Sequence, residues 1–284
     1  MANDLNGKVF LVTGATEGIG KAAALEFARR GATLVVVGRN KEKSERVVTE
    51  LKSQSHNSQI ELLLGDMSTL ADVRAVAAAF AKKYDRLDVL VNNAGAYFAD
   101  YKLSADGFEM TFALNHLGYF LLTHELLPLL RKTAGSRVVS TSSAAHQAGK
   151  VDLQAIAKRD GKVAGFGSYG DSKLCNILFT RALAQREKGI VTNCFHPGFV
   201  QTGFGQNNDG LMSSLIRWTA KVFARTPEKG AETLIWLPTS AEAGKLAGEY
   251  CVDCKPVKTS KLAQDASLAD GLWGLSEKLC GISK

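Results

Sequence analysis

Short apolar runs recur along the chain, and between them lie longer segments whose apolar residues follow a helical period. Nearly continuous apolar runs rich in β-branched residues are typical of strands buried on both faces of a sheet. Six such runs lie at residues 8–13, 32–38, 60–65, 87–93, 136–142 and 190–198, and a further strand is expected near 247–253. Helical patterns fill the intervals, including residues 19–31, 68–84 and a closing segment near 265–280. Strands alternating with helices predict a parallel sheet with helices on both faces.

The chain contains no internal repeat, low-complexity tract or linker at which it would divide into domains. Its length of 284 residues fits one large α/β domain. We therefore predict the α/β class, with a single doubly wound Rossmann-type domain over residues 1–284. Its central parallel sheet is expected to have about seven strands. The less regular segment near 203–226 is expected to cover a substrate cleft.

Composition and charge narrow the possible functions. The net charge is +7, but Lys and Arg are scattered among acidic residues and form no basic stripe, so we expect no nucleic-acid partner. Five cysteines are an odd number in a chain too long to need disulfides, which indicates the cytoplasm or another reducing intracellular compartment. Cys251 and Cys254 form one CxxC without a second pair or a nearby His, so we predict no metal site.

The N-terminal residues show no secretory signal, and no apolar run is long enough to cross a bilayer. We therefore expect a soluble protein without a transmembrane segment. The sequence leaves peripheral association with a membrane open.

A glycine-rich turn, TGATEGIG at residues 13–20, joins the first predicted strand to a helix. Glycines at this spacing permit a sharp turn, close approach to a pyrophosphate and tight packing of the helix on the strand. The helix N-terminus then directs N–H groups at the phosphates. An ordinary tight turn is the alternative interpretation. The candidate dinucleotide contacts are Gly14, Thr16, Glu17, Gly18, Ile19 and Gly20.

Arg39 and Asn40 follow the second strand, where nicotinamide cofactors are distinguished. An acidic residue there would bind the 2′-hydroxyl of NAD and repel a 2′-phosphate. Arg39 instead offers several donors to a phosphate, so NADP is the expected cofactor and NAD the less favoured one. Glu17 argues mildly against NADP because it adds an anion to the phosphate loop. A solvated arginine at a strand end is the other interpretation of Arg39.

Further candidates lie at the ends of the third and fourth strands. Ligands of open α/β sheets gather at the carboxyl ends of the strands. Asp66 is expected to accept a hydrogen bond from the adenine amino group, although it also fits a helix-start cap. Asn93, Ala94 and Gly95 are expected to line the adenosine side, and Met67 is a further candidate cofactor contact.

Tyr169 and Lys173 stand four residues apart at the start of a helix-like run, so their side chains leave the same helix face. An unperturbed tyrosine has a pKa near ~10. A neighbouring ammonium lowers that pKa and lets the phenol exchange a proton with a substrate oxygen. A Tyr and a Lys at this spacing often occur together by chance. The pair indicates catalysis here because it follows a glycine loop and a fifth strand that ends in small hydroxyl residues.

Together these motifs resemble the short-chain dehydrogenase/reductase superfamily, with TGATEGIG, NNAG, STSS, YGDSK and HPGFVQT in order over residues 8–202. The stretches DGFEMTFALNHLGYFLLTHELLPLL, YGDSKLCNILFTRALA and AGEYCVDCKPV further resemble its retinol-dehydrogenase-like branch. The resemblance implies a catalytic set of Asn115, Ser143, Tyr169 and Lys173. It also implies that the segment after the sixth strand contacts the nicotinamide carboxamide, through Pro197, Gly198, Val200 and Thr202.

The chain departs from the superfamily pattern in its spacing. Ser143 and Tyr169 are 26 residues apart, about twice the separation in compact members of the superfamily. This longer connection is typical of the retinol-dehydrogenase-like and carbonyl-reductase branches. Pairing of the segments near 104–132 and 166–188 in a homodimer remains open. His146 and His196, which flank the motifs, are expected to have structural or hydrogen-bonding roles.

The first functional hypothesis is an NADP-dependent oxidoreductase that interconverts an apolar ketone or aldehyde and its alcohol. Tyr169 would pass the proton, Ser143 would orient the oxygen, and Lys173 would lower the tyrosine pKa and bind the nicotinamide ribose. A cofactor-bound regulatory or scaffold protein on the same fold is the alternative. An epimerase or dehydratase that uses bound NAD transiently is a weaker one.

Overall fold

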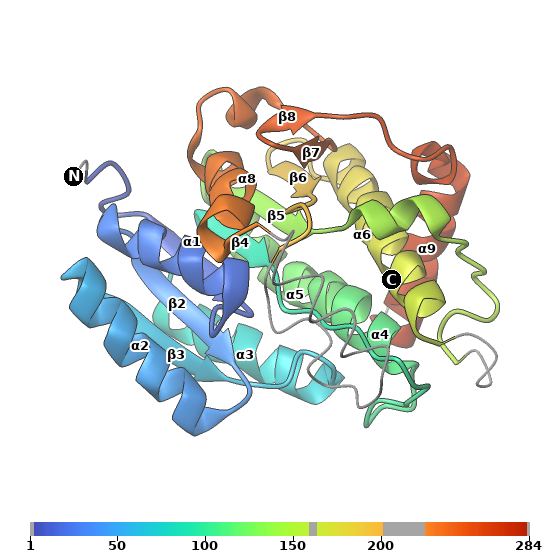
Figure 1. Ribbon diagram of the computed structural model, residues 1–284, viewed down its shortest axis with the longest axis horizontal. Coiled ribbons are helices and arrows are strands. Elements are labelled where there is room, and N and C mark those ends of the chain that lie inside the picture. The colour runs from blue at the N-terminus through green and yellow to red at the C-terminus, as the bar shows by residue number, and fades with distance from the viewer. Residues whose placement is uncertain (1–2, 159–163, 201–224, 283–284) are drawn as a thin grey trace.

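The computed structural model describes residues 3–158, 164–200 and 225–282. Their strands form one sheet in the order β3-β2-β1-β4-β5-β6-β7-β8, in which β1 to β7 are parallel (Figure 1). The strands are β1 (Val9–Thr13), β2 (Thr33–Gly38), β3 (Ile60–Leu64), β4 (Val89–Asn92), β5 (Arg137–Thr141), β6 (Val191–Phe195), β7 (Tyr250–Val252) and β8 (Lys255–Pro256).

The order of the strands reverses between β1 and β4, as expected for a doubly wound fold. The predicted α/β class and Rossmann-type domain are therefore confirmed. The described sheet has eight strands where the sequence indicated about seven. The additional strand is the two-residue β8, which pairs antiparallel with β7 across a tight turn at Asp253 and Cys254. Both turn residues have positive φ, which tight hairpin turns require.

Helices cover both faces of the sheet, and the sheet separates two apolar cores. The helices are α1 (Gly18–Arg29), α2 (Lys41–Ser55), α3 (Leu70–Lys83), α4 (Met110–Phe112), α5 (Gly118–Lys132), α6 (Phe166–Arg186), α8 (Pro227–Thr239) and α9 (Ala266–Leu279). Side chains of α1, α2 and α8 form one core with alternate strand residues, including Phe27, Val47 and Leu234. The other core contains Val73 of α3, Phe120 of α5 and Leu178 of α6. The chain thus forms three layers.

The C-terminal helix α9 lies alongside α6 (Figure 1). The Trp273 ring lies 5.0 Å from the Phe120 ring and 6.0 Å from the Phe179 ring, measured between centroids. The guanidinium of Arg186 lies 4.6 Å from the Trp273 centroid. Helix α9 therefore covers the side of α5 and α6 that carries Phe120 and Phe179. A homodimer through these two helices would have to use other residues.

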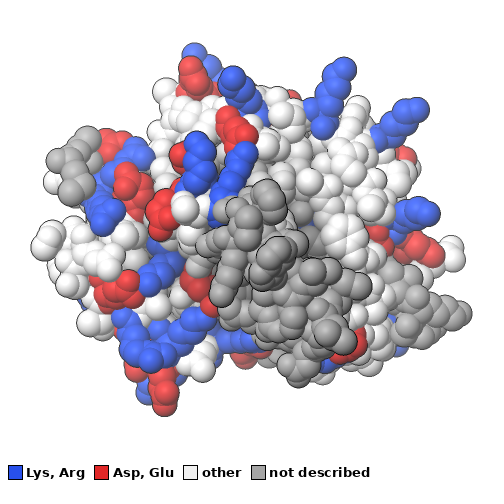
Figure 2. All heavy atoms as spheres, viewed as in Figure 1, with Lys and Arg blue, Asp and Glu red and all other residues white. Residues whose placement is uncertain are grey.

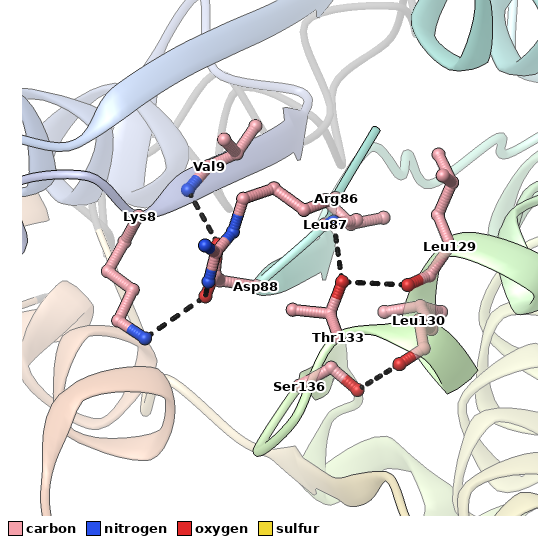
Figure 3. Close-up of polar contacts among 9 residues, drawn as sticks. All are labelled: Lys8, Val9, Arg86, Leu87, Asp88, Leu129, Leu130, Thr133 and Ser136. Atoms are coloured by element: carbon pink, nitrogen blue, oxygen red, sulfur yellow. Dashed lines mark hydrogen bonds and ion pairs between the residues drawn. The ribbon is translucent and has the colours of Figure 1, made fainter. Parts of the chain in front are cut away.

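A polar cluster holds together the amino-terminal ends of β1 and β4 (Figure 3). The Asp88 carboxylate accepts hydrogen bonds from the Val9 N–H at 3.0 Å, from Lys8 Nζ at 3.1 Å and from two Arg86 nitrogens at 2.7 and 2.9 Å. Nearby, Thr133 Oγ1 accepts from the Leu87 N–H at 3.1 Å. This edge of the sheet is thus fixed by local and long-range hydrogen bonds. Across the described ranges, no helix has the length and apolar character of a membrane span.

Candidate active site

A cavity of about 480 Å³ lies at the carboxyl ends of β1, β4, β5 and β6. It brings together segments that the sequence places far apart. Of the predicted site residues, the following line it: Gly14, Thr16, Glu17, Gly18, Ile19, Gly20, Asn93, Ala94, Gly95, Ser143, Tyr169, Lys173, Pro197, Gly198 and Val200. Thr202 lies outside the described residues, as does most of the predicted cleft segment 203–226.

The β1–α1 turn at the cavity wall requires glycine at two positions. Gly14 has φ +65°, and a Cβ there would lie 2.7 Å from the Ala94 Cα. A Cβ on Gly20 would lie 2.2 Å from the Gly14 carbonyl oxygen. Helix α1 begins at Gly18, and within the described structure its first turn has no side-chain cap and no acidic residue. The uncapped N–H groups of this first turn therefore fit the phosphates of a dinucleotide.

Asn93 joins three strand ends beneath this turn. Its Nδ2 donates to the carbonyl oxygens of Thr13 at 3.2 Å and Gly14 at 3.1 Å. Its Oδ1 accepts from Thr141 Oγ1 at 3.1 Å. These bonds fix the glycine turn of β1 relative to β5, whose end leads to Ser143. The side chain of Asn93 thus serves the architecture of the cavity.

A second cavity, of about 430 Å³, lies at the ends of β2 and β3 and is lined by Arg39, Asn40, Leu64, Gly65, Asp66 and Asp72. The Arg39 side chain is 61% exposed, and its Nη1 lies 3.8 Å from Asp66 Oδ2. Asp66 Oδ1 accepts from the N–H and hydroxyl of Ser68, which lies before α3; the N-cap of that helix is Thr69, so Asp66 lines the cavity and does not cap the helix. Asn40 caps α2, because its Oδ1 accepts from the Lys43 N–H at 2.9 Å.

Two predicted contacts, Met67 and Glu17, have surroundings that the sequence did not indicate. Met67 is 5% exposed and packs in the core, so its side chain lines neither cavity. Glu17 lines the larger cavity and forms an ion pair with Lys43 on α2. Its negative charge therefore has a cationic partner beside the phosphate loop. Over the face shown in Figure 2, basic and acidic side chains are interspersed. Ion pairs among the described residues include Lys21–Glu50 and Lys83–Glu61.

Tyr169 and Lys173 lie in the first two turns of α6, on the side that faces the end of β5. Lys173 is 3% exposed, and its Nζ donates to the Thr141 carbonyl at 3.1 Å. The same Nζ lies 5.5 Å from the centroid of the Tyr169 ring. The expected Tyr–Lys pair is therefore present on one helix face, with the ammonium deeper than the phenol.

The two serines after β5 have different surroundings. Ser142 is buried, and its hydroxyl donates to the Lys173 carbonyl at 2.8 Å. Ser143 is partly exposed in the cavity and forms a side-chain hydrogen bond with Tyr169. Ser143 also begins the short 3₁₀ helix η2 (Ala144–Ala148), where its Oγ accepts from the Ala145 N–H at 3.2 Å.

The pKa values of the pair shift toward the uncharged forms. Burial raises the pKa of Tyr169 to about 12, although the hydrogen bond with Ser143 acts in the opposite direction. Burial lowers the pKa of Lys173 to about 7. The direction for Tyr169 is opposite to the expected lowering by Lys173. The reason is burial, which disfavours the phenolate of Tyr169 and also disfavours the ammonium form of Lys173 that would stabilise it.

Asn115 lies in η1 (Ala113–Leu117), a π-helical turn between α4 and α5. Its side chain forms two bonds with Ala96, one from the Ala96 N–H at 2.9 Å and one to the Ala96 carbonyl at 3.0 Å. Its Nδ2 also donates to Ser172 Oγ at 3.0 Å. Asn115 therefore ties the loop after β4 to α6 beside Lys173. Single π-turns inside helices are frequent at functional sites.

Several cavity residues had no signal in the sequence analysis, among them Ala96, Tyr97, Ala144, Ala145, Phe166 and Phe199. Tyr97 packs edge-on against Tyr169, with ring centroids 6.2 Å apart. Phe166 is 60% exposed and Phe199 is 53% exposed. Phe199 lies within the motif HPGFVQT and Tyr97 lies two residues after NNAG, so proximity to these motifs is the signal that would have found them. Phe166 belongs to the long connection before Tyr169, where no motif marks it.

His196 also lines the cavity, and burial, with a contribution from Arg225, lowers its pKa to about 4. It is therefore neutral near neutral pH. Within the described ranges, no cluster of three or more His, Cys, Asp or Glu residues could hold a metal ion.

Comparisons with known proteins agree with this arrangement. A family model described as short chain dehydrogenase matches residues 8–210. Human retinol dehydrogenase 11 is 39% identical over 283 residues, covering 98% of this chain and 87% of that protein. The crystal structure of an uncharacterized protein from Mycobacterium paratuberculosis superimposes with a TM-score of 0.79 at 30% identity, covering 98% of this chain and 94% of that one. The crystal structure of a short chain dehydrogenase from Burkholderia cenocepacia J2315 in complex with NADP superimposes with a TM-score of 0.69 at 26% identity. The match covers 87% of this chain and 96% of that one.

Proposed function

The chain belongs to the short-chain dehydrogenase/reductase family, in its retinol-dehydrogenase-like branch, and from this premise we propose that it is an NADP-dependent reductase of apolar aldehydes or ketones. Membership already assigns it to oxidoreductases that use a nicotinamide cofactor to interconvert carbonyl compounds and alcohols. The proposal adds the cofactor preference, the acid and the nature of the substrate. The single observation that carries it is the shared cavity of the glycine turn, Ser143, Tyr169 and Lys173.

Tyr169 is the proton donor in this proposal. With a pKa of about 12, the phenol is protonated at neutral pH and can give its proton to the carbonyl oxygen as that oxygen gains charge. Ser143, which hydrogen-bonds Tyr169, holds the same oxygen and fixes its distance from the phenol. The bound nicotinamide supplies the hydride. Reduction of the carbonyl is therefore the direction that the protonated phenol favours.

Lys173 has three tasks in this proposal. Its Nζ lies 5.5 Å from the phenol ring centroid, so its charged form stabilises the phenolate left after proton transfer. Its pKa of about 7 means that both of its forms are populated near neutral pH, which suits a group that relays a proton. Asn115, bonded to Ala96 and Ser172, holds the neighbouring turn in place. Lys173 is also the group that would bind the nicotinamide ribose.

Arg39 supports NADP as the preferred cofactor. It lies at the end of β2 beside the second cavity, and no acidic residue occupies the position that binds the 2′-hydroxyl of NAD. Its ion pair with Asp66 is long and exposed, so little free energy is needed to turn Arg39 toward a phosphate. The NADP complex of the Burkholderia relative supports the same choice.

The rim of the larger cavity supports an apolar substrate. Tyr97, Phe166 and Phe199 present aromatic surface there, and Ala144 and Ala145 leave space next to Ser143. Large exposed aromatic rings favour an apolar ligand because its binding removes their surface from water. The name of the human relative suggests retinaldehyde as one probe of this class.

A substrate panel tests the proposal. Retinaldehyde, benzaldehyde and cyclohexanone would be offered with NADPH and with NADH, and the loss of reduced-cofactor absorbance followed. We expect turnover of at least one compound, faster with NADPH, and loss of that turnover in Ser143→Ala. Tight NADPH binding without turnover of any compound would favour the alternative, a cofactor-bound regulatory or scaffold protein.

A further inference from the structure

His146 is a buried histidine on η2 that the proposed chemistry does not use. It is 1% exposed and lies three residues after Ser143. Its Nδ1 lies 2.8 Å from the Ser143 carbonyl oxygen. Its Nε2 lies 3.4 Å from the backbone nitrogen of Ser260, in the loop between β8 and α9. The imidazole thus connects the C-terminal part of the chain to the residue that holds the substrate oxygen.

The two partners of the ring determine its tautomer. A carbonyl oxygen only accepts, so Nδ1 must carry the proton that it donates to Ser143. A backbone N–H only donates, so Nε2 must keep its lone pair toward Ser260. Burial lowers the pKa of His146, which agrees with a neutral ring. The Tyr250 ring of β7 packs edge-on against the imidazole at 4.8 Å and holds its plane.

Ser143 is held at its main chain by this contact. Its carbonyl accepts from the His146 N–H at 3.1 Å and from Nδ1 at 2.8 Å, so one residue supplies both donors. The Ser143 backbone is extended, with φ −160° and ψ 156°, and its side chain faces the cavity with Tyr169. A fixed peptide plane after Ser143 therefore limits the positions that its Oγ can take. Misplacement of a reacting group by about 1 Å costs on the order of 10²-fold in rate.

We propose that His146 is a positioning residue for Ser143: its Nδ1–H, fixed by the Ser260 N–H on Nε2 and by packing on Tyr250, orients the serine that holds the substrate oxygen. This inference rests on the proposed function, since it gives Ser143 a role in catalysis. Through Ser260, the loop between β8 and α9 would then help to position the active-site serine, although residues 253–260 line neither cavity. The proposal concerns hydrogen bonds within the chain, so the cofactor is not needed to form them.

Two substitutions separate the donor of His146 from its other contacts. In His146→Asn the amide nitrogen stands where Nδ1 stands and keeps a donor toward Ser143. In His146→Gln the amide reaches the place of Nε2 and leaves the Ser143 carbonyl without a side-chain donor. We expect His146→Gln to lower kcat by 10- to 100-fold, with the KM and Kd for NADPH unchanged, and His146→Asn to keep kcat within about threefold of wild type.

Thermal unfolding of both variants serves as the control, because each loses the imidazole ring against Tyr250 and should lose similar stability. Equal losses of kcat and of Tm in Asn and Gln variants would show a role in packing alone and overturn the inference. A second arm measures the residual kcat of Ser143→Ala at high enzyme concentration, which His146→Gln should not lower further because the two residues act as one unit. An additive further loss there would also contradict the proposal.

The outcome for Ser143 itself separates this inference from the proposed function. Full turnover in Ser143→Ala would overturn both, since no catalytic serine would remain to be positioned. Loss of turnover in Ser143→Ala together with full turnover in His146→Gln would leave the proposed function intact and reject His146 as its positioning residue.

Discussion

The two edges of the central sheet bury charged groups in opposite ways. At the amino-terminal edge, the 5% exposed Asp88 has three charged or polar partners (Figure 3). Burial alone would raise its pKa, but the hydrogen bonds from Arg86, the Val9 N–H and Lys8 lower it. At the carboxyl-terminal edge, the 3% exposed Lys173 donates to the neutral carbonyl of Thr141, and burial lowers its pKa to about 7.

The difference indicates what each edge is for. A buried charge with several hydrogen-bonded partners is compensated in the folded state, and loss of those partners lowers the free energy of unfolding. A buried charge with few partners costs folding free energy, and perturbed pKa values of this kind gather at catalytic sites. The described structure therefore places stabilising electrostatics at one end of the strands and the groups of the proposed reaction at the other. Substitutions at the two ends should separate stability from activity.

Tyr169→Phe should have the largest effect at the reactive edge. It removes only the hydroxyl, so the apolar contacts of the ring, including that with Tyr97, are kept. We expect kcat for carbonyl reduction to fall by about 10³-fold or more, because the proton donor of the reaction is lost. The Kd for NADPH, measured by fluorescence titration, and the Tm should change little. Turnover at the wild-type rate would reject Tyr169 as the acid.

Lys173→Met should lower activity and raise stability together. We expect kcat to fall by about 10²-fold. The Thr141 carbonyl keeps the Asn176 Nδ2 donor at 3.0 Å, so no buried acceptor is left unpaired. Between about pH 7 and the unfolded pKa of Lys, the unfolded chain binds more protons, so wild-type stability rises with pH. The gain in Tm should therefore be greatest below about pH 7, roughly 3–6 °C, and smaller at pH 9.5.

Calorimetry of wild type and Lys173→Met below about pH 7 and at pH 9.5 measures how the gain in Tm depends on pH. A variant that is less stable than wild type at both would show that Lys173 stabilises the fold, and the contrast between the edges would fail.

Asp88→Ala should lower stability and leave activity unchanged, in contrast to Lys173→Met. Removing the carboxylate leaves the buried Val9 N–H without its acceptor and ends the pairing with Lys8 and Arg86. Both cations are nearly half exposed, which limits their contribution, so we expect a loss of about 2 kcal/mol and roughly 4–8 °C in Tm. Activity per folded molecule should be unchanged. Denaturant unfolding and active-site titration measure the two quantities.

Asp88→Asn is the matched control, since it keeps an acceptor for the Val9 N–H and should lose less stability. Because the folded pKa of Asp88 is lowered, its contribution is present above the unfolded pKa and is lost as the pH falls through the folded value. The difference between wild type and Asp88→Asn should therefore shrink as the pH falls below about 4, the unfolded pKa, and disappear once the pH is below the lowered folded pKa. A difference that persists there would assign the stability to packing.

Local patterns predicted the strands, the glycine turn and the Tyr–Lys spacing because each depends on a few consecutive residues. They missed β8 because two residues, Lys255 and Pro256, form no period and pair only through the turn at Asp253 and Cys254. The pKa of Tyr169 was predicted in the wrong direction because it depends on burial, which arises when α6 packs against the end of β5. The ion pair of Glu17 with Lys43 joins residues 26 positions apart, which no local motif encodes.

Arg39→Ala tests the outer rim of the reactive edge, where the effect should be smallest. Arg39 is 61% exposed, so solvent screens its charge and we expect only about a 10-fold rise in the Kd for NADPH, with NADH changed less than twofold. Lys41→Ala is the matched control: Lys41 begins α2 close to Arg39, is 70% exposed and lines neither cavity. It removes the same charge and should change the Kd for NADPH by less than twofold. Equal effects of the two substitutions would mean that general positive potential, and not Arg39, recognises the 2′-phosphate.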